Sequence, residues 1–155
     1  MESISLYQFI NHAAFHLING MGFEEMDSIM ILISNKFVWI PLYIYILYLL
    51  FKKDKENFIW TILAIILLIF FADSGSVNLF KNQFEILRPC HTADIISKMR
   101  FVTDCGGKYG FISSHASNSF AIAFFIFLLL KNKTIFFWLF NWAAIIAFSR
   151  VYLGL

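Results

Sequence analysis

The stretch Ile59–Ala72 constrains the fold more than any other part of this sequence, because its 14 residues are apolar on every helical face. A helix in a soluble protein keeps a polar stripe toward water, and one without such a stripe lies in a large core or in a membrane. A chain of 155 residues offers no large core. The composition agrees, since 60% of residues are hydrophobic and only 14% are charged, where ~25% is typical of soluble domains. We therefore expect an integral membrane protein.

Four predominantly apolar segments have the ~20 residues that a helix needs to span a membrane. The first 27 residues instead mix apolar and polar residues, as an amphipathic helix at the membrane interface does. The sequence therefore predicts one all-α domain over residues 1–155, a membrane bundle of about four transmembrane helices plus an N-terminal interfacial helix. The four segments are residues 28–51, interrupted by Lys36 and Pro41; residues 58–80, containing Asp73; residues 109–130, without a charged residue; and residues 134–155, with Arg150 near the end.

Lysines in the two short loops predict the orientation of the bundle. Residues 52–55 and 131–133 carry five of them, and short loops rich in Lys and Arg face the cytoplasm. The N-terminus, the long loop 81–108 and the C-terminus then face outward. Because this outer loop is also basic, its cations need another explanation, and a bound anion provides one.

Three polar clusters interrupt the apolar pattern, at residues 81–89, 111–118 and 149–155. The predicted topology brings all three to the outer face. Lys81 and Arg88 are seven residues apart, so we expect them to share a helical face. An Arg guanidinium binds phosphate oxygens in a bidentate manner and a Lys acts as a point charge. Arg150 would approach the same place from the end of the last segment.

The second cluster adds a helix start to these cations. Ser113, Ser114 and His115 open an apolar segment, and the unpaired N–H groups and positive dipole end of a helix N-terminus attract anions. Taken singly, each cation fits a flank anchor whose charge reaches water, and the serines fit a close helix contact. His115 alone fits a packing residue. Their joint occurrence on one face favours a phosphate site.

These clusters resemble the motifs of the type-2 phosphatidic acid phosphatase family, which includes lipid phosphatases, bacterial acid phosphatases and vanadium haloperoxidases. Lys81 followed by six residues and Arg88-Pro89 is similar to the family's Lys-x6-Arg-Pro motif. Residues 112–115, Ile-Ser-Ser-His, resemble Pro-Ser-Gly-His, and Ser149-Arg150 resembles the opening of Ser-Arg-x5-His-x3-Asp. The order, the spacing and the placement of the three clusters relative to the apolar segments all agree with the family. The residues of the last two clusters, Phe-Ile-Ser-Ser-His-Ala and Ser-Arg-Val-Tyr-Leu-Gly, further resemble the membrane branch that acts on undecaprenyl diphosphate and other lipid phosphates.

The chain departs from the family pattern in two ways. Ile112 and Ser114 stand where the family has Pro and Gly, although Ser114 still offers its backbone N–H. Five residues follow Arg150, and the family's nucleophilic His would come next, after Leu155. We therefore expect the given chain to be incomplete or inactive as an enzyme.

The resemblance implies a mechanism in which that His attacks phosphorus and forms a phosphohistidine. His115 would protonate the leaving oxygen as the catalytic acid. Transition-state charge would be stabilised by the phosphate-binding residues, without a cofactor or a metal ion. These residues are Lys81, Arg88, Ser113, Ser114 and Arg150.

The sequence therefore predicts a membrane lipid phosphate or diphosphate phosphatase. Undecaprenyl diphosphate is the first expected substrate, and phosphatidate or phosphatidylglycerol phosphate the second. A noncatalytic phosphate- or lipid-binding membrane protein is the alternative, and a channel subunit fits less well because the charges gather at one end. We expect the bacterial inner membrane, with the site on the extracytoplasmic face. A net charge of +2 without a basic run among exposed aromatics gives no basis for a nucleic acid partner.

Cys90 and Cys105 both fall in the predicted outer loop, where the compartment permits disulfides. Without a CxxC pair they give no basis for a zinc site. We expect them to form a disulfide that tethers Arg88 to the helix start at Ser113, with Gly106, Gly107 and Gly110 supplying the turns. Two unpaired thiols are the alternative.

Overall fold

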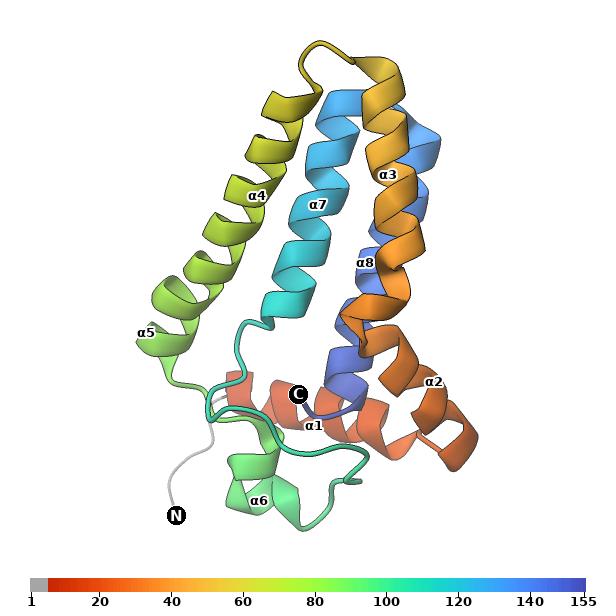
Figure 1. Cartoon of the computed structure of the whole chain (residues 1–155). Helices are drawn as coiled ribbons and strands as arrows, with labels where there is room; N and C mark the ends of the chain where they lie inside the picture. The colour runs from red at the N-terminus through yellow and green to blue at the C-terminus, as the bar shows by residue number, and fades with distance from the viewer. Residues whose placement is uncertain (1–5) are drawn as a thin grey trace.

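The computed structural model describes residues 6–155, and its regular elements are helices (Figure 1). Apart from these helices, the described part has one isolated antiparallel bridge, between Leu87 and Tyr109. The all-α class is confirmed. The elements are α1 (Leu6–Gly20), α2 (Glu24–Ser34), η1 (Lys36–Trp39), α3 (Ile40–Lys53), α4 (Phe58–Gly75), η2 (Ser76–Lys81), α5 (Asn82–Phe84), η3 (Pro89–His91), α6 (Ala93–Ile96), α7 (Ser114–Leu130) and α8 (Lys133–Tyr152).

Two helical runs are, by length and composition, able to cross a membrane alone: Phe58–Phe84, which continues α4 through η2, and Lys133–Tyr152. A third candidate is the bent pair Glu24–Ser34 and Lys36–Lys53. The apolar helix α7 has 17 residues, at the lower end of the range for a span. These findings support a helical membrane bundle, and the number of four spans stays a prediction.

The first predicted segment, residues 28–51, is not one straight helix. The chain bends by 64° between α2 and the run from Lys36 to Lys53. Asn35 leaves the helix with φ −81° and ψ 115°, and its side chain accepts a hydrogen bond from the Phe37 N–H that starts η1. Pro41 lies in the first turn of α3, where its missing N–H costs nothing. The bend therefore separates α2, at the lower end of the bundle, from α3 (Figure 1).

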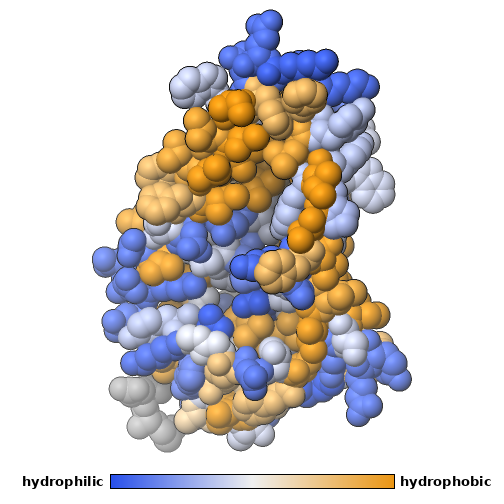
Figure 2. All heavy atoms as spheres, in the orientation of Figure 1, coloured by the Kyte–Doolittle hydropathy of each residue, from blue (hydrophilic) through white to orange (hydrophobic). Residues whose placement is uncertain are grey.

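The bundle core lies between α3, α7 and α8. Trp142 of α8 is buried, and its ring meets the rings of Trp39 and Tyr43 edge to face. By contrast, α4 buries none of its residues, and Trp60 is 70% exposed. Apolar side chains form a large patch on the upper left of the molecule, with hydrophilic ones above it and a mixed surface below (Figure 2). This is the surface expected of a helix that faces lipid. The core residues are Ile46, Leu50, Ala123, Ile126, Leu139, Trp142, Ala143 and Ile146.

Both short basic turns lie at the upper end of the bundle, as the predicted topology requires (Figure 1). The Lys53 ammonium donates to the Leu129 carbonyl and so joins the α3 end to the α7 end. The loop after α5, helix α1 and the C-terminus gather at the opposite end (Figure 1). Which end faces the cytoplasm stays a prediction.

Helix α1 crosses the lower end of the bundle (Figure 1). The predicted interfacial helix also included residues 1–5, which lie outside the described residues. Asn19 near the end of α1 is only 1% exposed, and its amide N–H group donates to the carbonyls of Arg100 and Tyr152. The Arg100 N–H donates to the Asn19 side-chain oxygen at 2.7 Å. One side chain therefore joins α1, the long loop and the end of α8.

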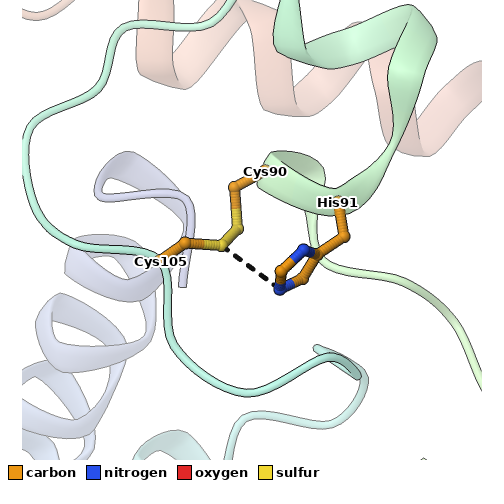
Figure 3. Close-up of side chains that lie close together, drawn as sticks. All are labelled: Cys90, His91 and Cys105. Atoms are coloured by element: carbon orange, nitrogen blue, oxygen red, sulfur yellow. Dashed lines mark hydrogen bonds between the residues drawn. A yellow bond between two sulfur atoms is a disulfide. The ribbon is translucent and has the colours of Figure 1, made fainter.

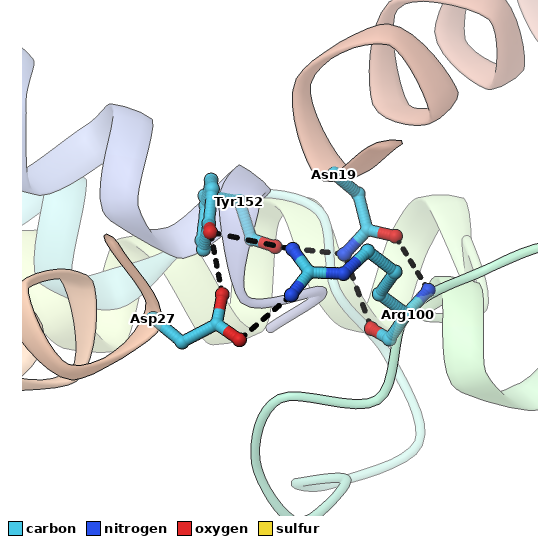
Figure 4. A network of polar contacts seen from close by, with 4 residues as sticks. All are labelled: Asn19, Asp27, Arg100 and Tyr152. Carbon is cyan, nitrogen blue, oxygen red and sulfur yellow. Dashed lines mark hydrogen bonds and ion pairs between the residues drawn. The ribbon is translucent and has the colours of Figure 1, made fainter. Parts of the chain in front are cut away.

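A second part of this network extends to α2 (Figure 4). The Arg100 guanidinium donates to Asp27 at 2.7 Å, and the Tyr152 hydroxyl donates to the other Asp27 oxygen at 2.5 Å. The hydrogen bonds to Tyr152 and Asp27 raise the pKa of Arg100. A Cβ at Gly22 would collide with both the Arg100 guanidinium and the Tyr152 hydroxyl, so glycine leaves the space that these two side chains occupy. We call these four residues, Asn19, Asp27, Arg100 and Tyr152, the α1–loop–α8 network.

Cys90 and Cys105 lie together in the long loop, with Cα atoms 6.2 Å apart and their sulfur atoms joined in the structure (Figure 3). Cys90 is buried and Cys105 is exposed. His91 lies beside them, with Nε2 3.5 Å from the Cys105 sulfur and 3.4 Å from the Gly106 carbonyl oxygen. This arrangement links the start of the loop, next to Arg88, to its middle.

We predict that Asn19→Ala lowers the free energy of unfolding by about 1–3 kcal/mol, because it leaves buried backbone groups of two distant segments without a partner. Thermal unfolding in detergent measures the change. Asn11→Ala is the matched control, since Asn11 is exposed on the same helix. Equal stability of the two variants would contradict a structural role for the network.

We also predict that Cys90 and Cys105 form a disulfide in the native membrane. Closing a loop of this length stabilises the fold by ~3 kcal/mol in the chain-entropy model. Maleimide labelling before and after reduction, on protein taken directly from membranes, measures the free thiols. Full labelling of both cysteines without reductant would rule out the bond and weaken the outward placement of the loop.

Candidate active site

A cavity of about 200 Å³ opens at the lower end of the bundle, and all six residues predicted to handle phosphate line it. They come from four places along the chain: the end of η2, the loop after α5, the start of α7 and the last turn of α8. The structure thus brings them together, while their chemical roles stay predictions. The lining residues are Lys81, Arg88, Gly110, Ser113, Ser114, His115, Arg150 and Leu155.

Lys81 reaches the cavity from η2, a π-helical turn that continues α4. Such turns inside α-helices are frequent at functional sites. The Lys81 ammonium donates to the Ser114 hydroxyl at 3.2 Å, the Ser114 and Ser76 hydroxyls are 2.8 Å apart, and Ser76 donates to the Asp73 carbonyl at 2.7 Å. Because the Ser76 proton is already used, the Ser114 hydroxyl donates to Ser76. Ser114 therefore orients Lys81 with its hydroxyl, and its backbone N–H is what it offers to an anion.

Arg88 does not share a helical face with Lys81, so that prediction is wrong. The helix ends after Phe84, where Glu85 turns into the left-handed region with φ 47°. The chain then runs extended, and the Arg88 N–H donates to the Lys108 carbonyl at 3.0 Å. Its Nε donates to the Tyr109 carbonyl at 3.3 Å. Arg88 is thus held by pairing with residues 108–110.

Two glycines make room for Arg88. A Cβ at Gly106 would collide with the Arg88 guanidinium, and one at Gly110 would lie 3.0 Å from the Arg88 Cγ. Neither glycine has a positive φ. The role that the structure shows for them is to leave space for Arg88, and their part in the turns stays a prediction. Partial burial lowers the pKa of Arg88 from its usual value.

The start of α7 faces the cavity. Ser113 precedes the first turn with extended backbone angles, and its side chain makes no capping hydrogen bond. The first N–H groups of a helix have no partner within the helix, so they remain available to an anion here. His115 follows in the first turn with an exposed side chain. An imidazole and a set of backbone donors therefore border the same cavity.

Arg150 approaches from the last turn of α8. The helix ends just beyond it in a Schellman arrangement, in which Leu155 N–H donates to the Arg150 carbonyl and Gly154 N–H to the Val151 carbonyl. Gly154 takes the left-handed conformation that this ending requires, with φ 74°. The Arg150 Nη1 donates to the Ser34 hydroxyl at 2.7 Å. Its Nε is buried and has no partner among residues 6–155.

Sequence reasoning missed two serines that support the cations. Ser76 bonds to Ser114, which orients Lys81. Ser34 bonds to Arg150. Ser76 bonds to Asp73, the carboxylate residue of the second apolar segment, through the Asp73 backbone carbonyl. No local pattern marks Ser34, since its partner lies 116 residues away.

The disulfide pair and His91 are not among the residues that line the cavity. Within the described chain, Cys90, His91 and Cys105 are the group of metal-binding side chains whose ligand atoms come close together. Both sulfur atoms of that group are joined to each other, so it does not offer three ligands in this state.

The arrangement gathers three cationic side chains, a helix N-terminus and an imidazole around a small cavity. Cationic donors bind phosphate oxygens by charge-assisted hydrogen bonds, and the orphaned Arg150 Nε is a buried donor that a ligand would satisfy. The cavity is therefore suited to a phosphate group presented at the end of a membrane bundle.

Comparison with known proteins agrees with this geometry. The chain is 33% identical over 142 residues to a lipid A 4'-phosphatase of Porphyromonas gingivalis, covering 90% of this chain and 60% of that protein. It is also 33% identical over 144 residues to a lipid A 4'-phosphatase of Bacteroides thetaiotaomicron, covering 88% of this chain and 62% of that protein. The chain thus spans about 60% of the length of these relatives. No solved structure matches it.

The profile of one protein family matches residues 57–155, more than half of the chain and the part that contains all three polar clusters. The chain belongs to the PAP2 superfamily, the family of type-2 phosphatidic acid phosphatases.

Proposed function

We propose that this chain forms part of a membrane phosphatase, an enzyme that removes a phosphate group from a lipid. The observation that carries the proposal is the meeting of Lys81, Arg88, Arg150 and His115 around one cavity at the end of an apolar bundle. A lipid substrate held in the bilayer presents its phosphate at this depth, where the bundle changes from apolar to polar surface (Figure 2).

The three cations and the α7 N-terminus would bind the three non-bridging oxygens of the phosphate. Charge builds up on these oxygens in the transition state of phosphoryl transfer, and fixed donors stabilise it without reorganising. Lys81 is oriented by Ser114, and Arg88 by the Tyr109 carbonyl. The preorganised donors would supply the electrostatic stabilisation that a metal ion supplies in other phosphatases.

His115 would act as the general acid that protonates the leaving oxygen. The family motif places the nucleophilic His one position after Leu155, and Leu155 lines the cavity. A longer form of the protein would therefore deliver that His directly beside the bound phosphate. The residues up to Leu155 supply the groups that would bind phosphate, and a noncatalytic phosphate- or lipid-binding membrane protein stays the alternative function.

The names of the relatives change the order of the expected substrates. Two lipid A 4'-phosphatases align with about nine-tenths of this chain, which supports a phosphorylated lipid A as the first substrate. The residues of the second and third motifs favoured undecaprenyl diphosphate. This lipid and phosphatidate become comparison substrates. We further propose the inner membrane as the location, with the cavity on its extracytoplasmic face, because both short lysine-rich turns lie at the other end.

We predict that Arg88→Ala and Arg150→Ala each weaken binding of inorganic vanadate or phosphate at least tenfold, since each removes charge-assisted hydrogen bonds worth ~1.5–3 kcal/mol. Titration of the detergent-solubilised chain measures the affinity, and thermal unfolding controls for folding. Lys98→Ala is the matched control, because Lys98 is an exposed cation of the same loop and does not line the cavity. Unchanged affinity in both Arg variants would make these residues interface anchors.

We predict that a longer form continuing past Leu155 releases phosphate from lipid A in the presence of EDTA, because the site's own cations stabilise the transition state. Phosphate release is compared among lipid A, undecaprenyl diphosphate and phosphatidate, and the 155-residue chain is assayed beside it. Loss of activity on chelation that a divalent ion restores would refute the metal-free mechanism. Robust turnover by the 155-residue chain would show that the nucleophile lies elsewhere.

A further inference from the structure

The guanidinium of Arg150 is held by a residue from the N-terminal part of the chain. Its Nη1 donates to the Ser34 hydroxyl at 2.7 Å, across 116 residues of sequence. Ser34 is the last residue of α2 and lies before residue 57, where the family match begins. A contact from outside the matched region thus reaches one of the cations that line the cavity.

The bend after α2 is what brings the Ser34 hydroxyl to Arg150, and it is fixed on both sides. Asn35 stops the helix and its side chain accepts from Phe37 N–H at 3.0 Å. The Trp39 indole N–H reaches back and donates to the Ile33 carbonyl at 2.8 Å, which satisfies a carbonyl freed by the break.

Trp39 also anchors the bend to α8, the helix that carries Arg150. Its ring meets that of Trp142 edge to face, with centroids 5.8 Å apart. Trp142 precedes Arg150 by eight residues, about two helical turns on the same helix. The aromatic contact and the Tyr152–Asp27 hydrogen bond therefore help to hold Ser34 beside Arg150, in addition to the hydrogen bond between them.

The bond to Ser34 decides which edge of the guanidinium is left for a ligand. A guanidinium is a planar fork whose donors pair in parallel along its edges. With Nη1 engaged by Ser34, the edge formed by Nε and Nη2 remains, and its Nε is the buried donor that has no partner in residues 6–155. This edge can hold two oxygens of one phosphate at once.

We propose that Ser34 is a positioning residue of the phosphate site, which fixes the Arg150 guanidinium so that its Nε–Nη2 edge binds phosphate in a bidentate manner. The inference rests on the proposed function of Arg150 as a phosphate ligand. It extends the site beyond the matched region, since the α2–α3 bend then contributes to phosphate binding.

The test is a double-mutant cycle on vanadate binding to the detergent-solubilised chain. Ser34→Ala is expected to weaken binding roughly tenfold, the size of effect given by one charge-assisted hydrogen bond. Ser34→Thr keeps the hydroxyl and should restore most of the affinity. In the Arg150→Ala background, Ser34→Ala should cause no further loss, because the two residues act as one unit. Ser28→Ala, at an exposed serine of the same helix, is the matched control.

Each other outcome overturns a distinct claim. Normal binding by Ser34→Ala together with weak binding by Arg150→Ala would refute the positioning role and leave the proposed function intact. Normal binding by Arg150→Ala would refute the phosphate role of Arg150 itself. A loss from Ser34→Ala that persists in the Arg150→Ala background, or that follows a lower unfolding temperature, would show that Ser34 supports the fold and not Arg150.

Discussion

The amide of Asn19 is the contact on which the lower end of the molecule depends. It is almost fully buried, and it bonds to backbone groups of Arg100 and Tyr152, which lie 81 and 133 residues further along the chain. A buried amide without partners is costly, so these segments have a strong reason to stay in this arrangement. Arg100 lies in the loop between Arg88 and Ser113, and Tyr152 lies two residues after Arg150. One network outside the cavity therefore holds the loop and the helix end that form two of its walls.

This support matters because the cavity gathers like charges. Lys81, Arg88 and Arg150 come from three different elements and meet around about 200 Å³, where their mutual repulsion opposes folding. Each cation is held by a neutral acceptor, namely the Ser114 hydroxyl, the Tyr109 carbonyl and the Ser34 hydroxyl. None of these acceptors neutralises the charge. The site thus keeps its positive potential for an anion, and the rest of the fold supplies the stability that the site itself lacks.

The sequence predicted the membrane class and the grouping of three polar clusters at one end, because these follow from local spacing and from the order of the apolar segments. With the family resemblance it also indicated six of the eight residues that line the cavity. It did not predict how the side chains are held. The spacing of Lys81 and Arg88 indicated one helix, but Glu85 ends that helix and the chain pairs with residues 108–110 instead. Gly106 and Gly110 indicated turns, and they provide space for Arg88. Such contacts depend on tertiary packing, and neither periodicity nor motif spacing predicts them.

The N-terminal segment shows where the family pattern and the complete site differ. The family profile begins at residue 57, yet Asn19, Asp27 and Ser34 all contact residues within the matched region. The two relatives align over more residues than that region contains, so their similarity extends into the segment before residue 57. The family motifs indicate which groups we propose to bind the phosphate. The bent α2–α3 segment supplies the Ser34 hydroxyl that accepts a hydrogen bond from Arg150, and it packs against α8 through the rings of Trp39 and Trp142.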